Sequence, residues 1–487
     1  MEYRLPLFVY LGRSAWAELY KYCLRCAKLP AVALVRKLCY TNCYHTGVAP
    51  GWFYLAVFNH LLGWRVCMDR YKLLITGGAP LRGETTVFGG KNTSVAVVPA
   101  MLLCDEPCVV ENLPDIEDIH VVYDMLNLLG AKVDYEPKAR RMTVDPRPVN
   151  SFHVPYQYTQ RMRASYYLWG ALLGRCGQCE VGYPGGCAIG NRPFEQHVKG
   201  FRALGAQVDD YGGMIYAKGD MVGADVFFDR ITVGGTINVM LAAAKAHGNT
   251  TIHNAAREPH IVDLANFLNS MGGRVRGAGT DTIRIRGVDY MHGSRYSVIP
   301  DQIETGTLMI AAAATHGDVT IRGCIPTHME ALTAKLLEMG VQVTSTDDTI
   351  RVRAERQHRA VNIKTQEYPG FPTDLQQPMS AMLTCAAGDS LVIETIFENR
   401  FKHLVEMQRM GAKVRIVEQT AIIEGVDALY GAPVTATDLR AGAALVIAGL
   451  MAKGTTEIYE PSYIERGYER IEDKLRALGA DIARVPL

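Results

Sequence analysis

One cysteine stands in a segment whose composition is typical of a loop. Cys187 lies within Tyr183–Pro193, where three glycines and two prolines surround it. Such a segment suits neither a helix interior nor a central strand. A loop thiol five residues from Arg192 has the solvent access and the neighbouring cation that make a thiol reactive. The alternative is a buried cysteine that packs as a small apolar residue, as we expect for Cys104, Cys108, Cys324 and Cys385.

A lysine flanked by glycines is a candidate ligand for an anion. Lys91 lies in Gly89-Gly-Lys-Asn-Thr-Ser94, which partly resembles a nucleotide phosphate loop. That loop requires a glycine where Thr85 stands and Ser or Thr where Asn92 stands. ATP-dependent chemistry is therefore not predicted, and Lys91 remains a candidate for a smaller anion.

Three polar segments interrupt the apolar pattern of the chain, namely Phe371–Asp374, Thr437–Arg440 and Glu465–Asp473. The third has alternating charges and predicts a helix with a solvated face. Arg466, just before Gly467 at the start of that helix, is a candidate anion ligand, because an Arg fork matches carboxylate and phosphate.

The elements that must position these residues come in repeats. Six times an apolar, helix-like run ends in Leu or Met, then Gly, a small residue, any residue and Val or Ile. Upstream of each run, an Ala/Leu-rich helix and a short strand are expected, as in Leu241–Ala255. Such self-similarity predicts one supersecondary unit repeated along the chain. The glycines of the six runs are Gly130, Gly205, Gly272, Gly340, Gly411 and Gly479.

Length and composition predict a globular protein of more than one domain. The 487 residues exceed what one core usually fills, so three repeats in each of two domains is the natural division. With 21% charged and 48% hydrophobic residues and no long apolar stretch, no membrane span is expected. The net charge is +1, and residues 1–67 carry eight Lys or Arg against two Asp or Glu. The remaining chain is therefore mildly acidic, which argues against nucleic acid as a partner.

Residues 1–67 differ from the rest in composition. They hold five of the 12 cysteines and three of the four tryptophans, and neither repeat phrase occurs among them. No signal peptide is recognisable. Cys23, Cys26, Cys39 and Cys43 lack the companion pair of a zinc finger, so no metal site is predicted. We expect residues 1–67 to be an atypical N-terminal extension and the functional protein to start at Met68. The odd number of cysteines from Met68 onward favours a reducing cytoplasm as its location.

Taken together, the phrases from Met68 to Leu487 resemble the UDP-N-acetylglucosamine 1-carboxyvinyltransferase family of enolpyruvyl transferases, which opens peptidoglycan synthesis. The matching segments are Gly90-Lys-Asn92, Met162–Ser165, Pro184–Gly190, Arg192-Pro193, Asn254–Pro259, Pro300-Asp301, Ile303–Gly306, Phe371–Asp374, Phe397–Phe401, Asp438–Arg440 and Arg466–Arg470. They are ordered along about 420 residues without a large gap.

The resemblance implies a fold. It is an α/β (α+β) fold, a two-domain inside-out α/β barrel of six βαβαββ-type repeats, three per domain, with helices inward and sheets outward. Residues 68–89 are expected to join residues 300–487 in one domain. Residues 90–299 are expected to form the other, which carries the Cys187 loop. Substrate is expected in the cleft between the domains, which close over that loop.

The resemblance also implies a reaction. The family adds the 3-hydroxyl of UDP-N-acetylglucosamine to C2 of phosphoenolpyruvate, protonates C3 and then eliminates phosphate. Such chemistry needs a base, an acid and cations. By motif position, Asp374 is the expected base, and Cys187 is the expected acid and the site of covalent attachment by enolpyruvate or fosfomycin. The expected ligands of phosphoenolpyruvate, besides Cys187, are Lys91, Arg163, Arg192, Arg440 and Arg466.

Contacts with the sugar nucleotide carry over in the same way. They are Asn92, Arg163, Arg192, Pro193, Arg230, Thr232, Val233, Gly234, Asp301, Asp374, Ile396 and Phe397. Glu258 and Arg400 are expected to shape the cleft. Gln160, Asn191 and Glu117 depart from common family residues, which bears on substrate affinity. No cofactor and no metal is expected, the partners are the two small-molecule substrates, and Cys187 predicts sensitivity to fosfomycin.

Two other functions were compared with this one. The sister transferase that acts on shikimate 3-phosphate shares the fold, but it uses no cysteine in a glycine-rich loop. A non-catalytic relative that binds a UDP-sugar would be expected to have lost at least one of Lys91, Cys187, Asp374 and Arg466, and all four are present.

Overall fold

The computed structural model describes residues 71–186, 189–190, 192–355 and 357–487. The predictions for residues 1–67, Cys187 and Asn191 therefore fall outside the described residues. The elements below belong to one compact unit, Tyr71–Val485. Within the described ranges, no helix has both the length and the apolar character to cross a membrane.

The described strands form six four-stranded sheets, and in each sheet the first two strands are parallel and the second and third antiparallel. Three sheets run β22 (Pro433–Thr435), β23 (Thr455–Tyr459), β1 (Tyr71–Thr76), β24 (Asp481–Pro486); β2 (Arg82–Thr86), β15 (Asp318–Arg322), β17 (Thr349–Arg353), β16 (Gln342–Ser345); and β18 (Ile363–Lys364), β19 (Asp389–Ile393), β21 (Thr420–Glu424), β20 (Lys413–Val417). The others run β14 (Arg295–Ser297), β3 (Cys108–Glu111), β5 (Arg141–Asp145), β4 (Lys132–Glu136); β6 (His153–Val154), β7 (Gln178–Gly182), β9 (Met214–Lys218), β8 (Gln207–Tyr211); and β10 (Asp225–Phe227), β11 (Asn249–His253), β13 (Thr282–Arg286), β12 (Arg274–Arg276).

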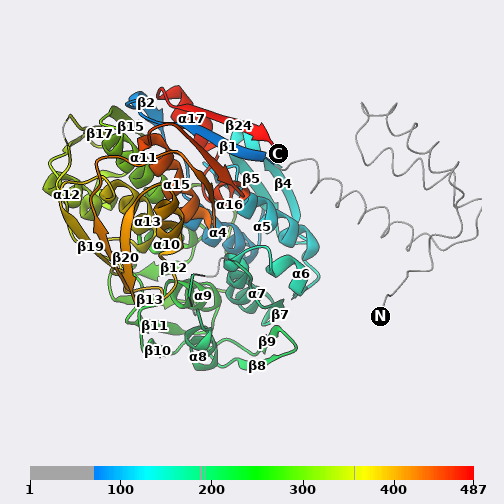
Figure 1. The fold of residues 1–487 in the computed structure, drawn as a ribbon. Helices are drawn as coiled ribbons and strands as arrows, with labels where there is room; N and C mark the ends of the chain where they lie inside the picture. Colours follow the sequence, from blue (N-terminus) through cyan, green and yellow to red (C-terminus); the bar gives the residue numbers. More distant parts are fainter. Residues whose placement is uncertain (1–70, 187–188, 191, 356) are drawn as a thin grey trace, which may run out of the picture. The chain divides into compact units, whose positions relative to one another are not determined.

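The longer helices are of two kinds. One kind is buried on nearly all sides, because small and apolar residues occupy its whole surface. These helices are α4 (Lys91–Ala100), α7 (Tyr167–Cys176), α9 (Val233–Ala243), α11 (Gln302–Ala314), α13 (Thr373–Leu383) and α15 (Leu439–Met451). The other kind keeps exposed residues on one side: α5 (Glu117–Leu128), α8 (Glu195–Ala203), α10 (Pro259–Ser270), α12 (Glu330–Glu338), α14 (Lys402–Arg409) and α17 (Ile471–Ala477). In Figure 1 many strands lie toward the periphery of this unit and α4, α11, α13 and α15 toward its middle.

The six glycines that mark the repeats in the sequence share one backbone conformation. Each follows a helix of the second kind, and their φ angles lie between 93° and 99°. Residues with a side chain rarely adopt such φ angles, whereas glycine adopts them at little cost and can therefore end a helix. The regular spacing of these glycines in the sequence therefore corresponds to six equivalent helix ends. The predicted mixed α/β content is confirmed.

The buried apolar residues form two clusters. The first core runs from Val95 to Val298. The second core combines Leu73–Val87 with Ile303–Ile482. The chain crosses between them twice, and the two crossing segments meet in an antiparallel bridge between Gly89 and Pro300. A Cβ on Gly89 would lie 1.8 Å from the carbonyl oxygen of Asn112, so only glycine fits this crossing.

Candidate active site

Lys91 is the first residue of α4 and is held there by a carboxylate from the second core. Its backbone N–H donates to Asp301 Oδ2 at 2.9 Å. Asp301 Oδ1 accepts from the N–H groups of Ile303 and Glu304 at 2.7 and 3.0 Å, which caps α11. One carboxylate thus joins the N-termini of two helices, where backbone N–H groups lack partners within their own helix.

The side chain of Lys91 shares a second carboxylate with a distant arginine. Asp118, in the first turn of α5, accepts from Lys91 Nζ at 2.9 Å and from Arg466 Nε at 3.1 Å. Burial alone would raise the pKa of Asp118, but Lys91 and Arg466 hold that pKa below its ordinary value. Sequence analysis missed Asp118, because an acidic residue in a first helical turn is a common feature without chemical meaning by itself.

Asp374, the second residue of α13, balances two buried guanidinium groups. It accepts from Arg400 Nη2 at 2.7 Å and from Arg440 Nε at 3.1 Å. Arg400 and Arg440 are only 2% and 1% exposed. Arg400 Nε and Nη1 and Arg440 Nη1 are buried without a hydrogen-bond partner among the described residues. Two buried cations with one carboxylate and spare donors are suited to bind an anion.

The ion pairs of Asp374 predict sensitivity to acid. Burial would raise the pKa of Asp374, but Arg440 and Arg400 bring it far below its ordinary value. A depressed folded-state pKa contributes stability above the unfolded pKa of about 4, and that stability is lost as the pH falls toward the folded value. We expect the free energy of unfolding to fall by up to about 1.4 kcal/mol per pH unit below pH 4 from this group. Urea unfolding between pH 5 and 3 measures this, and an equal slope in Asp374→Asn would contradict it.

A third group of cations surrounds an aromatic ring. Arg163, the first residue of the 3₁₀ turn Arg163–Tyr166, donates to the carbonyl of Arg192. Burial, with the charge of Arg192, lowers the pKa of Arg163 to about 10. The guanidinium of Arg192 lies 5.7 Å from the centre of the Phe397 ring, and that of Arg400 lies 5.1 Å from it. Phe397 therefore links the predicted cations of the first core to those of the second.

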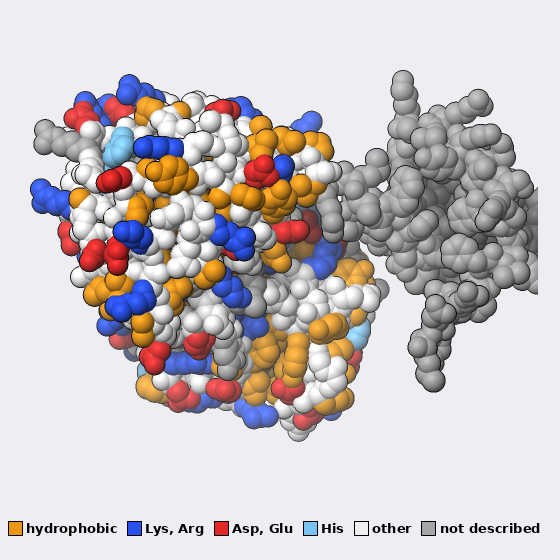
Figure 2. Space-filling model, in the orientation of Figure 1, with side chains coloured by type: hydrophobic (Ala, Val, Ile, Leu, Met, Phe, Trp, Pro, Cys, Tyr) orange, Lys and Arg blue, Asp and Glu red, His pale blue; other side chains and the backbone are white. Residues whose placement is uncertain are grey.

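These groups lie close to one another. A Cβ on Gly467, the neighbour of Arg466, would lie 3.3 Å from Arg440 Nη1. Asp301, which holds Lys91, also acts electrostatically on Arg440. Of the five cations predicted from the sequence, Lys91 and Arg466 bind the buried Asp118, and Arg440 binds the partly buried Asp374. Arg163 and Arg192 are connected to them through Phe397 and Arg400. Figure 2 shows Lys and Arg side chains around a hollow near the middle of the visible face.

The predicted sugar-nucleotide contacts lie in two places. Thr232 caps α9 by accepting from the N–H of Gly235 at 3.2 Å, so Val233 and Gly234 form the start of that helix, after the exposed Arg230. The N–H groups of Ile396 and Phe397 already donate to the buried Glu394, at 2.9 and 3.2 Å. Only the carbonyls and side chains of these two residues remain for a ligand.

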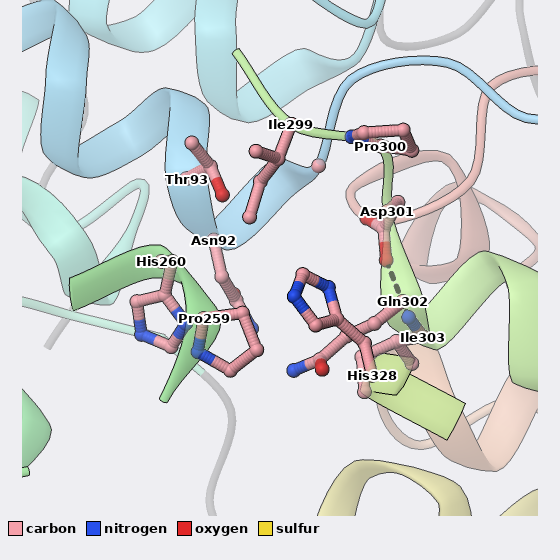
Figure 3. A pocket seen from close by; sticks show the side chains of 11 residues that line it. Asn92, Thr93, Pro259, His260, Ile299, Pro300, Asp301, Gln302, Ile303 and His328 are labelled. Carbon is pink, nitrogen blue, oxygen red and sulfur yellow. Dashed lines mark hydrogen bonds between the residues drawn. The ribbon is translucent and has the colours of Figure 1, made fainter. Parts of the chain in front are cut away.

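Asn92 and Asp301 line a hollow of about 260 Å³. Four other polar residues, which sequence analysis did not assign to the site, also line it: Thr93, His260, Gln302 and His328. In Figure 3, His328 and Gln302 lie on one side and Pro259 and His260 on the other. Burial lowers the pKa of His260 to about 4, against the pull of Asp374 and Asp301, so the imidazole facing the hollow is neutral at pH 7.

Residues on both sides of Cys187 contact other parts of the site. The N–H of Asn399 donates to the carbonyl of Ile189 at 3.0 Å, and a Cβ on Gly190 would lie 2.2 Å from Glu398 Oε2. Tyr183–Gly186 is neither helix nor strand, as predicted, and Gln160 Nε2 donates to the Tyr183 carbonyl at 2.9 Å. Glu117 pairs with Arg161 on the surface at 2.8 Å.

The helix predicted over Glu465–Asp473 is wrong. A short helix, α16 (Ser462–Glu465), ends at Arg466, and α17 begins only at Ile471. Gly467 interrupts the pattern, and Arg470 has a left-handed φ of 43°. Arg466 is therefore in a turn, with its guanidinium on Asp118. Cys104, Cys108 and Cys324 are buried, as predicted, and Cys385 is partly buried.

Glu258 lies at a partly buried position and Arg400 at a buried one. Glu258 immediately precedes α10, its Oε2 has no hydrogen-bond partner among the described residues, and burial raises its pKa. Arg400 binds Asp374, as described above.

Comparisons with known proteins fit this geometry. Residues 75–475 match the family described as EPSP synthase (3-phosphoshikimate 1-carboxyvinyltransferase). UDP-N-acetylglucosamine 1-carboxyvinyltransferase 3 of Caldanaerobacter subterraneus is 55% identical over 415 residues, which cover 85% of this chain and 99% of that protein. The UDP-N-acetylglucosamine 1-carboxyvinyltransferase of Clostridium botulinum is 52% identical over 416 residues, which cover 85% and 100%.

Solved structures show the same fold. The enolpyruvyl transferase NikO from Streptomyces tendae is similar with a TM-score of 0.76 at 24% identity, over 86% of this chain and 99% of that one. EPSP synthase from Acinetobacter baumannii is similar with a TM-score of 0.67 at 18% identity, over 85% and 99%. The chain therefore belongs to the EPSP synthase family and, within it, to the UDP-N-acetylglucosamine 1-carboxyvinyltransferases.

Proposed function

We propose that this protein transfers the enolpyruvyl group of phosphoenolpyruvate to the 3-hydroxyl of UDP-N-acetylglucosamine, releasing phosphate, in the first committed step of peptidoglycan synthesis. The observation that carries the proposal is the surplus of buried cations. Arg400 and Arg440 leave three donors unpaired around Asp374. Relatives more than 50% identical over nearly their whole length are UDP-N-acetylglucosamine 1-carboxyvinyltransferases.

The proposed steps assign each group one task. Asp374 takes the proton of the sugar 3-hydroxyl while the hydroxyl oxygen attacks C2 of phosphoenolpyruvate. Cys187 gives a proton to C3. Phosphate then leaves C2 with the proton held by Asp374, and C3 returns a proton to the Cys187 thiolate, which restores the double bond. Lys91, Arg163, Arg192, Arg440 and Arg466 bind the phosphate and carboxylate of phosphoenolpyruvate, and Lys91 touches both substrates.

The ion pairs of Asp374 add a condition to this mechanism. A carboxylate held by two guanidinium groups is a weak base, because its pKa lies far below the ordinary value. A substrate anion that binds the spare donors of Arg400 and Arg440 would weaken both pairs. Asp374 then becomes basic enough to take the proton of the sugar hydroxyl only when phosphoenolpyruvate is bound. Proton transfer therefore follows the binding of phosphoenolpyruvate.

We further propose the family's inside-out barrel of six βαβαββ-type units, with residues 68–89 and 300–487 in one domain and 90–299 in the other. The two separate cores and the bridge between Gly89 and Pro300 support this division. The sugar nucleotide is placed between the domains, on Asn92, Asp301 and the start of α9. A cytoplasmic location and the absence of nucleic-acid partners remain proposals from composition.

Phosphate release tests the function. The full chain with phosphoenolpyruvate is expected to release phosphate with UDP-N-acetylglucosamine and not with shikimate 3-phosphate. Cys187→Ala and preincubation with fosfomycin are each expected to lower the rate at least about 10²-fold, because either removes the acid. Release only with shikimate 3-phosphate would show the sister activity. Binding of the UDP-sugar without release would show a non-catalytic protein.

A further inference from the structure

A salt bridge outside the predicted site joins the two cores. Arg140 follows the 3₁₀ turn Pro137–Ala139 between β4 and β5, and its Nη1 and Nη2 donate to Glu469 at 2.5 and 2.8 Å. Arg140 belongs to the part of the chain that forms the first core, and Glu469 to the part that forms the second. The side chains are only 22% and 19% exposed, which protects the pair from full solvent screening.

Further contacts fix both members of the pair. Glu469 Oε2 also accepts from the backbone N–H of Asp115 at 3.1 Å. The guanidinium of Arg140 lies 3.6 Å from the centre of the Phe88 ring, in the segment that crosses between the cores. Lys474 Nζ lies 5.2 Å from the same ring and donates to the buried Glu304 at 2.7 Å. A bidentate pair with a stacked guanidinium has one geometry, unlike a mobile surface ion pair.

The contacts of Glu469 and of Arg466 involve the same two stretches of sequence. Asp115 lies three residues before Asp118, and Arg466 lies three residues before Glu469. Two bridges therefore join the same two segments, an outer one at Glu469 and an inner one at Arg466. Between Arg466 and Glu469, Tyr468 is tied to its own core through Thr307, at 2.9 Å. Arg466 and Glu469 are thus the two members of this turn with described ion pairs to the part of the chain that forms the first core.

We infer that Arg140 and Glu469 are positioning residues. Their ion pair holds the turn that carries Arg466 close to the first core, so that Arg466 and Lys91 can both bind Asp118. The inference rests on the proposed function, since it concerns the binding of phosphoenolpyruvate. Without the outer bridge, the turn around Gly467 loses one of its two described ion pairs to the first-core part of the chain and keeps that of Arg466 with Asp118. The position of Arg466 relative to Lys91 is then less strictly held. Phosphoenolpyruvate binding then suffers, whereas the sugar-nucleotide contacts at α9 do not depend on this turn.

The test compares Arg140→Met, Glu469→Gln and the double variant. Methionine keeps apolar contact with Phe88 and glutamine keeps the shape of the acceptor, so the folded state is preserved. We expect each single variant to raise the KM for phosphoenolpyruvate about 10-fold, the double variant to do no worse than the singles, and the KM for UDP-N-acetylglucosamine to stay within about twofold. The matched control is Arg295→Met, which breaks a bidentate pair with Glu111 within one sheet, at 2.9 and 2.6 Å.

The outcomes separate the inference from the function beneath it. No turnover by the unaltered chain contradicts the proposed function. Turnover by the unaltered chain, with variants that behave like Arg295→Met, overturns the inference. So do equal increases in both KM values or additive effects in the double variant, because these are signs of general destabilisation. Thermal unfolding of all variants identifies any that do not fold.

Discussion

Asp374→Asn is expected to lower kcat about 10³-fold, the typical worth of a positioned general base. The amide has the shape of the carboxylate but cannot take the proton of the sugar hydroxyl. It also leaves Arg400 and Arg440 without a counter-charge at positions 2% and 1% exposed. Removing one partner of a buried ion pair costs about 3–5 kcal/mol, so a lower unfolding temperature is expected as well.

Stability must be separated from chemistry in that experiment. Single-turnover rates at saturating substrates, measured below the onset of unfolding, report the chemical step. Asp263→Asn is a suitable control, because Asp263 is buried, accepts from Ile299 N–H at 3.3 Å and has no ion pair with a predicted cation within the described part of the chain. This control is expected to lose stability and keep kcat within a few-fold. Equal losses of kcat in both variants would contradict the role of Asp374.

Lys91→Met is expected to lower kcat/KM for phosphoenolpyruvate about 10²- to 10³-fold, the loss typical of one electrostatic donor in a buried site. Methionine fills a similar volume without charge. The positive end of α4 remains, but the ammonium that lies 2.9 Å from Asp118 is lost. Asp118 then pairs with Arg466 alone, which holds that guanidinium away from a substrate anion.

Steady-state kinetics and calorimetry of the sugar nucleotide test this expectation. Binding of UDP-N-acetylglucosamine is expected to weaken far less than kcat/KM falls, because most of its proposed contacts lie elsewhere. Lys72→Met is the matched control, since Lys72 forms a 2.7 Å pair with Glu457 in a sheet outside the site. A Lys91→Met variant within tenfold of the unaltered chain would remove Lys91 from the proposed cation set.

Local patterns in the sequence predicted local structure well. The six glycines fixed the helix ends, because a left-handed φ is a property of single residues. The prediction of a helix over Glu465–Asp473 was wrong, because it relied on the alternating charges and gave too little weight to Gly467. Lys91 was singled out by its flanking glycines, and Arg440 and Asp374 were assigned roles through a resemblance of motifs, in each case without knowledge of their partners.

Residues that act through distant partners could not be found in this way. Asp118 lies 348 residues from Arg466, and Arg140 lies 329 residues from Glu469. Neither pair has a local pattern, and each is meaningful only when two separate cores meet. His260 was missed for a similar reason, because it looks like an ordinary residue of a helix start until the hollow lined by Asn92 and Asp301 is seen.

The pairing of β1 with β23 has a consequence for folding during synthesis. Lys72 in β1 bonds Glu457 in β23 across 385 residues, whereas residues 95–298 complete the first core without them. At about 5–20 residues per second, β1 waits roughly 20–80 s on the ribosome before its partner strand exists. The first core is thus able to form while the second still lacks a sheet. A chaperone that shields apolar strands is needed most by β1, whose neighbouring strands β23 and β24 are made last.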